Sequence, residues 1–134
     1  MFHTYGANPT SAAAARAVLE VLRDEKLQEN ASTVGGKLLE RLHDLKYKHQ
    51  AIGDVRGHGL MLAIEIVTDR DSKTPEKEMT TEVIEASRAQ GIILSKSGPF
   101  QQCLRMVPPL CLSLTDVDQV TNSLDQALAE AATR

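Results

Sequence analysis

Residues 51–67 read AIGDVRGHGLMLAIEIV, and this run sets the fold class. Aliphatic and β-branched residues on both sides of a short glycine-containing segment are typical of two strands joined by a tight turn. We therefore predict a strand over residues 51–56, a turn at 57–59 and a strand over 60–67. Alternation along the second strand predicts one core-facing side. This side carries Leu60, Leu62, Ile64 and Ile66.

Helical patterns lie on both sides of the predicted hairpin. Apolar residues recur every three or four positions in four segments, which are residues 10–24, 26–48, 79–90 and 115 onward. Asn8 and Pro9 suit the cap and the first position of the first helix. Thr115 suits the cap of the last helix, with Asp118 three residues later. The glycine pair at 35–36 predicts close packing or a kink inside the second helix.

Short strands complete the predicted sheet. Residues 103–107 read as a strand that ends at two prolines, and residues 92–94 read as a brief strand. We expect residues 95–102 to form a loop and residues 110–114 to pair briefly. Helices and strands in runs with short connections predict an α+β fold. The expected architecture is a small antiparallel-rich sheet with helices packed on one face.

The composition argues against several classes of protein. The 134 residues carry 15 basic and 18 acidic side chains, a formal net charge of -3, without the basic surplus typical of nucleic-acid-binding proteins. No window approaches the roughly 20 apolar residues of a membrane span. Cys103 and Cys111 are too few for a disulfide scaffold and have no zinc ligands nearby. We therefore expect no nucleic-acid partner, no membrane span and no metal.

Arg105 is a candidate binding residue, because it lies inside an apolar strand beside a proline pair. Alternation places Leu104 and Met106 on one face of this strand and Arg105 on the other. A guanidinium fixed on a short strand suits bidentate binding of a carboxylate. The alternative, which spacing alone favours, is an edge-strand arginine that reaches water or pairs with a glutamate. For Cys103, on the same strand, we expect a buried and unreactive thiol.

Two further segments have both a functional and a structural interpretation. Thr4, Tyr5 and Gly6 precede the predicted helix start at Asn8, where a hydroxyl and free amides near a helix N-terminus suit an anion such as phosphate. The alternative is an ordinary capped helix start, which spacing alone favours. Residues 53–59 place glycines around Arg56 but lack the spacing of a phosphate-binding loop. A structural hairpin is the favoured interpretation there.

Three runs in order resemble the class III, fold-type-I aminotransferases that use pyridoxal phosphate. They are FHTYGANP at residues 2–9, IGDVRGHGLM at 52–61 and LRMVPPL at 104–110. These runs are similar to the family's T-[FY]-G-G-N-P segment, its IGDVRGxGLM hairpin and its xRxxPPL strand. Residues 26–31 are most similar to the alanine–glyoxylate aminotransferase type 2 branch. Ala7 stands where the family usually has glycine.

The resemblance implies a division of the chain and roles for particular residues. Residues 1–24 would contain the phosphate-contacting turn and a helix that enters the small domain, and residues 25–134 would form the C-terminal small domain. Thr4, with Tyr5 beside it, is implied to contact the phosphate of pyridoxal 5′-phosphate across a homodimer interface. Arg105 is implied to bind the carboxylate of the amino-acid or keto-acid substrate. Arg56 and its flanking glycines are implied to be structural.

The family's Schiff-base lysine has no counterpart in this sequence. It belongs upstream of the threonine motif, and Lys96 does not occupy the matching position. We therefore expect no catalytic residue among the 134 and no transamination by this chain alone. For the complete enzyme, the resemblance implies transfer of an amino group from L-alanine to glyoxylate, giving pyruvate and glycine, and a mitochondrial location.

Two alternatives stay open at this point. Another class III aminotransferase, acting on an ω-amino acid, ornithine or acetylornithine, fits the same motifs. A non-catalytic α+β module that binds a protein partner is the second. We expect a domain separated from its partner to expose an apolar patch around residues 12–15, and an independent module to lack one.

Overall fold

The computed structural model describes residues 6 and 8–133 of the chain. Its elements, in chain order, are α1 (Pro9–Asp24), α2 (Leu27–Lys48), β1 (Ile52–His58), β2 (Met61–Asp69), β3 (Thr74–Pro75), α3 (Lys77–Ala89), β4 (Ser95–Ser97), β5 (Cys103–Met106) and α4 (Leu114–Ala131). The predicted phosphate-contacting residues Thr4 and Tyr5 lie outside the described residues.

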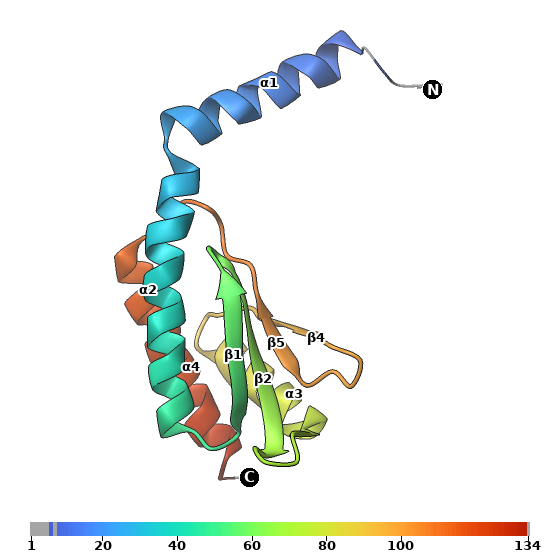
Figure 1. Ribbon diagram of the computed structural model, residues 1–134, viewed down its shortest axis with the longest axis vertical. Helices are drawn as coiled ribbons and strands as arrows, with labels where there is room; N and C mark the ends of the chain where they lie inside the picture. The colour runs from blue at the N-terminus through green and yellow to red at the C-terminus, as the bar shows by residue number, and fades with distance from the viewer. Residues whose placement is uncertain (1–5, 7, 134) are drawn as a thin grey trace.

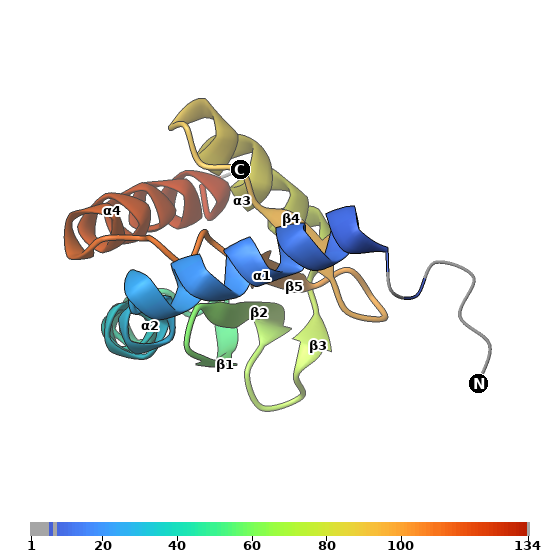
Figure 2. The same ribbon diagram turned by 90° about the horizontal axis from the view of Figure 1, so that it is seen from above.

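The strands form one antiparallel sheet in the order β1-β2-β5-β4, and β3 pairs with β2. Helices α2, α3 and α4 pack together on one face of this sheet (Figures 1 and 2). The opposite face, called the open face below, carries no helix in the part of the chain that the structure describes. The predicted α+β fold with helices on one face is confirmed.

The core lies between the covered sheet face and the three helices. Side chains with 0% exposure come from both layers, and they include Leu38, Leu42, Ile52, Ile64, Ile66, Val83, Leu104, Leu124 and Leu128. The predicted core side of the second hairpin strand is confirmed, because Leu60 and Leu62 are only 4% and 2% exposed. Burial of these aliphatic side chains is the main favourable contribution to folding.

The β1–β2 hairpin packs its turn directly on α2. His58 pairs with Met61, so Gly59 and Leu60 form the turn, and Gly59 adopts a φ of 54°. A Cβ atom at Gly35 of α2 would lie 2.2 Å from the carbonyl oxygen of Gly59. The predicted close packing at the glycine pair is therefore confirmed at Gly35, whereas a Cβ at Gly36 would meet no atom within 4 Å.

Arg70, which follows β2, joins the end of α2 to the start of β1. Its guanidinium donates hydrogen bonds to the carbonyl oxygens of His49 (2.8 Å), Gln50 (3.1 Å), Ile52 (3.0 Å) and Lys46. The last carbonyls of a helix lack partners within the helix. One side chain therefore supplies hydrogen-bond donors to the carbonyl groups at the end of α2 and fixes where β1 begins.

Several boundary predictions are wrong. The hairpin turn lies at Gly59 and Leu60 and not at residues 57–59, because Gly57 and His58 still pair with β2. Residues 92–94 form no strand; β4 instead begins at Ser95, because residues 95–97 are the ones in register with β5. Residues 110–113 form a turn and coil instead of a pairing strand. The last helix is capped by Ser113, whose reciprocal capping box with Asp116 starts the helix before Thr115.

Helix α1 projects from the rest of the molecule (Figure 1). None of its residues is buried, and the apolar side chains of Val18 and Leu19 are 59% and 65% exposed. Residues 12–15 are exposed as well, as expected for a domain separated from its partner. Across residues 6 and 8–133, no helix is both long enough and apolar enough to cross a membrane.

Gly35→Ala tests the backbone contact between α2 and the hairpin, with Gly36→Ala as the matched control. We expect Gly35→Ala to lower the free energy of unfolding by about 1–3 kcal/mol, because the added methyl forces the helix and turn apart. Gly36→Ala should raise it by about 0.5–1 kcal/mol, since alanine is the better helix former. Urea denaturation followed by circular dichroism measures both, and equal effects would contradict the contact.

Candidate functional site

Arg105 lies on the open face, on β5 between β2 and β4. Its Cα pairs with Ala63 on β2 and with Ser95 on β4, so both strand neighbours have short side chains. Leu104 and Met106 are 0% and 5% exposed in the core, whereas Arg105 is exposed. The predicted alternation is confirmed. β5 is not an edge strand, because β4 pairs with its outer side, but the exposure of Arg105 agrees with the alternative in which its side chain reaches water.

The guanidinium of Arg105 has no protein partner in the described residues. No carboxylate of residues 6 and 8–133 forms an ion pair with it, and no described acceptor forms a hydrogen bond with its side chain. The predicted alternative of a glutamate partner is therefore wrong within this part of the chain. Because a guanidinium carries five N–H donors in a planar fork, Arg105 can bind a carboxylate or a phosphate in a bidentate manner.

Arg56 lies in the same row of the open face and is already paired. Its Cα is also opposite Ala63, on the other side of β2 from Arg105. Its Nη1 donates to Asp54 Oδ2 at 2.7 Å and to Glu65 Oε2 at 2.9 Å. The predicted structural hairpin at residues 53–59 is confirmed as the β1–β2 hairpin, and the Arg56 ion pairs join its two strands.

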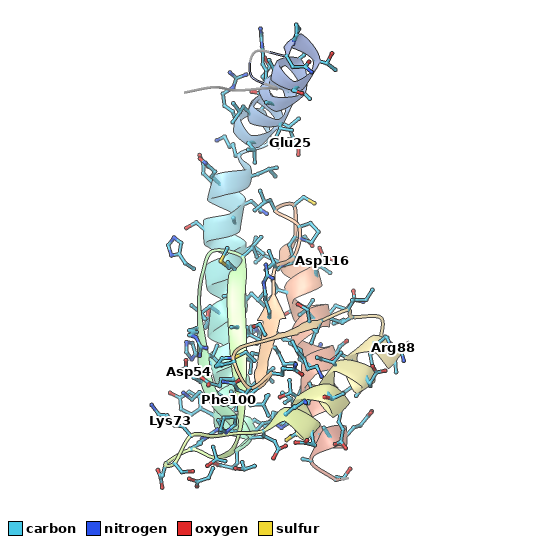
Figure 3. The ribbon with its side chains drawn as sticks, turned by 90° about the vertical axis from the view of Figure 1, so that its right-hand side faces the viewer. Glu25, Asp54, Lys73, Arg88, Phe100 and Asp116 are labelled. Carbon is cyan, nitrogen blue, oxygen red and sulfur yellow. The ribbon has the colours of Figure 1, made fainter. Side chains whose placement is uncertain are left out.

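The partners of Arg56 belong to a longer hydrogen-bonded network. Glu65 Oε1 accepts a hydrogen bond from Gln102 Nε2 at 3.1 Å, and Gln102 Oε1 accepts one from the backbone N–H of Phe100 at 3.2 Å. Gln102 is only 6% exposed. Asp54 and Phe100 accordingly lie at the same end of the sheet, away from α1 (Figure 3). The network therefore ties the β4–β5 turn to the hairpin.

The pKa shifts follow from these contacts. The hydrogen bond from Arg56 lowers the pKa of Asp54, and burial opposes this effect only in part. Hydrogen bonds to Asp54 and Glu65 raise the pKa of Arg56, which therefore stays charged. Burial raises the pKa of the Cys103 thiol, whose Sγ lies 3.6 Å from Arg56 Nη2. The predicted buried thiol at Cys103 is confirmed, with 4% exposure.

The start of α1 is a capped helix start in the described residues. The side chain of Asn8 accepts hydrogen bonds from the backbone N–H groups of Thr10 (2.9 Å) and Ser11 (3.4 Å). These two amides are therefore not free for an anion, and an anion at this helix end needs donors from preceding residues. Thr4 and Tyr5, the residues predicted for that role, lie outside the described residues.

Sequence reasoning missed Asp54, Glu65 and Gln102 as members of the site. Strand alternation combined with the hairpin register pairs Asp54 with Glu65 across β1 and β2, and this was the available signal. Lys96 is exposed on β4 and donates to Thr81 Oγ1 at 3.0 Å. Among the residues that the structure describes, no group of three His, Cys, Asp or Glu side chains is placed to hold a metal ion.

Comparisons of the sequence and of the fold with known proteins indicate the same family. The family model described as aminotransferase class-III matches residues 2–128. The chain is 43% identical over 129 residues to alanine–glyoxylate aminotransferase 2 homolog 2, mitochondrial, of Arabidopsis thaliana, covering 96% of this chain and 27% of the relative. It is 40% identical over 128 residues to ethanolamine-phosphate phospho-lyase homolog 1 of Caenorhabditis elegans, covering 95% of this chain and 27% of the relative.

The fold is similar to solved transaminase structures. An amine transaminase from an uncultivated Pseudomonas species, in its pyridoxal-phosphate-bound form, superimposes with a TM-score of 0.88 at 31% sequence identity. The similarity covers 98% of this chain and 30% of that structure. The chain thus spans about a quarter of the length of the two curated relatives above.

Acid titration of stability tests the Asp54–Arg56 pair. A carboxyl whose pKa is lowered by folding stabilises the native state above its unfolded pKa and loses that contribution as the pH falls through its folded pKa. We therefore expect the free energy of unfolding of Asp54→Asn to fall less steeply than that of the parent chain from about pH 4 downward. Urea titrations at a series of pH values measure this slope.

Arg56→Gln is the matching variant, because it removes the other partner of the same pair. Its profile should flatten in the same pH range. Parallel profiles for the parent and both variants would contradict a pKa of Asp54 lowered by Arg56.

Proposed function

This chain belongs to the class III aminotransferases, and we propose that it forms the C-terminal small domain and entry segment of an enzyme that transfers an amino group from L-alanine to glyoxylate. The 43% identity to the Arabidopsis alanine–glyoxylate aminotransferase 2 homolog supports this substrate pair. By the same relationship, we propose a mitochondrial location and a homodimer for the complete enzyme. Residues 1–24 would be the entry segment and residues 25–134 the small domain.

The guanidinium of Arg105, which has no partner among the described residues, carries the proposal. It is exposed on a strand fixed by neighbours on both sides, and its flanking positions hold only Ala63 and Ser95. A substrate carboxylate would accept two parallel hydrogen bonds from it, which fix both the position and the plane of the substrate. Amino donor and keto-acid acceptor each carry such a carboxylate, so one arginine would serve both halves of the reaction.

Class III aminotransferases use pyridoxal 5′-phosphate. When bound, this cofactor supplies the electron sink for moving an amino group between an amino acid and a keto acid. The described residues fit a supporting role, because Asn8 fixes the start of α1 and the positive end of the helix lies there. Thr4 and Tyr5 precede Asn8 closely in the sequence, and we propose that they contact the cofactor phosphate.

The exposed apolar side chains of α1 favour a domain with a partner over an independent interaction module. Val18, Leu19 and Val21 are 59%, 65% and 46% exposed on one helix with no buried residue. In a soluble chain, such a surface normally packs against another part of the protein. This observation supports the small-domain assignment and disfavours the non-catalytic alternative.

An assay of the 134-residue chain with L-alanine, glyoxylate and added pyridoxal phosphate tests the expected lack of a cofactor-binding lysine. We expect no pyruvate formation and no protein-bound cofactor absorption band, because Lys96, on β4, does not occupy the position that the family resemblance gives to the Schiff-base lysine. Turnover, or a band that Lys96→Ala abolishes, would overturn the expectation.

A chimera tests the proposed role of Arg105. The matching segment of the Arabidopsis relative is replaced by this chain, and transamination of glyoxylate by L-alanine is measured. We expect Arg105→Ala to lower kcat/KM for both substrates about 100-fold, as expected for loss of a charge-assisted hydrogen-bonding partner. Arg105→Lys should restore part of the loss, since lysine keeps the charge and loses the fork.

Arg41→Ala is the matched control for the chimera. Arg41 is also an exposed arginine, but it lies on α2 and pairs with Asp118 at 3.1 Å. Equal losses in the Arg41 and Arg105 variants would contradict a specific role for Arg105. A chimera that releases phosphate from phosphoethanolamine faster than it forms pyruvate would contradict the proposed substrate pair.

A further inference from the structure

Two arginines share one row of the open face and differ in how they are paired. Arg56 on β1 and Arg105 on β5 are both in register with Ala63, which lies between them on β2. Because neighbouring strands are about 4.8 Å apart, the two Cα atoms are separated by about 10 Å. Without its partners, Arg56 would offer a second anion-binding guanidinium beside that of Arg105.

The carboxylates around Arg56 neutralise it. Asp54 and Glu65 accept hydrogen bonds from the same Nη1 atom at 2.7 and 2.9 Å. A second cation, Lys46, lies 3.9 Å from Asp54. Two carboxylates therefore face two cations at this end of the row, and an incoming anion finds little net positive charge there.

The arrangement is held by more than an exposed ion pair. The other oxygen of Glu65 accepts a hydrogen bond from Gln102, a residue that is only 6% exposed and that also binds the backbone N–H of Phe100. An isolated surface pair contributes little and is easily rearranged. A network anchored by a buried amide holds its carboxylates in place.

We propose that Asp54 and Glu65 act as specificity-determining positioning residues that keep Arg56 out of ligand binding, so that the open face accepts monocarboxylates at Arg105 and disfavours dianions. This inference rests on the proposed role of Arg105. A ligand with one carboxylate uses Arg105 alone. A second anionic group that extends along the row toward Arg56 finds that guanidinium already neutralised by two carboxylates and gains no further attraction there.

Titration of the 134-residue chain with acetate and with succinate at low ionic strength tests this inference. The readout is the Nε–Hε signal of each arginine in ¹⁵N-resolved NMR spectra, assigned with Arg56→Lys and Arg105→Lys. In the parent chain we expect both ligands to shift the Arg105 signal and to leave the Arg56 signal in place. The two ligands are compared on the parent chain, and the two lysine variants serve only to assign the signals.

The double variant Asp54→Asn/Glu65→Gln releases Arg56. We expect its affinity for succinate to rise about tenfold relative to acetate, because one further charge-assisted interaction becomes available. The Arg56 signal should now respond to succinate. The single variant Asp54→Asn should show a smaller change of the same sign, and it serves if the double variant does not give a dispersed spectrum.

Asp118→Asn/Glu85→Gln is the matched control, because it removes two carboxylates that pair with Arg41 and Arg88 on the helices. It makes the same change in net charge and should leave the succinate-to-acetate ratio unchanged.

The outcomes separate the inference from the proposed function. If Arg105 responds but Arg56 responds equally in the parent chain, or if the control shifts the ratio as much as the double variant, the inference is wrong and the role of Arg105 stands. If Arg105 does not respond to either anion, both the role of Arg105 and the inference fall.

Discussion

The contact between Gly35 of α2 and the carbonyl of Gly59 is the constraint on which the site depends. No side chain separates the helix from the hairpin turn at this point, since a Cβ atom at Gly35 would lie 2.2 Å from that oxygen. The position of α2 therefore determines where the β1–β2 hairpin turns. The turn in turn sets the register that pairs Arg56 with Ala63, and β5 places Arg105 opposite the same residue.

This register gives two chemically identical side chains different properties. Arg56 has Asp54 on its own strand and Glu65 on the neighbouring strand within hydrogen-bond distance. Arg105 has Ala63 and Ser95 beside it, and neither side chain carries a negative charge that could neutralise the guanidinium. A shift of one residue along β1 would move Arg56 and Asp54 to the core side of the sheet. The register of the strands therefore causes the difference between the two arginines, because it decides which side chains surround each guanidinium.

Local patterns predicted what depends on neighbouring residues in sequence. The hairpin, the exposed side of Arg105 and the Asn8 cap of α1 follow from alternation and capping preferences. The Arg56 network could not be read in the same way, because Gln102 reaches Glu65 across 37 positions. Residues 92–94 have strand composition, but pairing with β5 selects 95–97 instead. Thr115 is the cap predicted from sequence, but Ser113 forms the capping box with Asp116, so Thr115 lies inside α4. The predicted roles of Thr4 and Tyr5 stay predictions, since both lie outside the described residues.

Family membership alone leaves the ligand of Arg105 open, because a guanidinium binds carboxylates and phosphates with similar geometry. Relatives of this chain include an alanine–glyoxylate aminotransferase homolog and an ethanolamine-phosphate phospho-lyase homolog at comparable identity. The surroundings of the guanidinium can distinguish the two ligands by charge. A phosphate monoester carries a charge of about -1.5 to -2 near neutral pH, whereas a substrate carboxylate carries one negative charge. With Asp54 and Glu65 neutralising Arg56 at the far end of the row, the single charge of Arg105 balances one carboxylate and leaves a phosphate monoester with excess negative charge. On this argument, the paired state of Arg56 favours an amino acid and a keto acid as the ligands of Arg105.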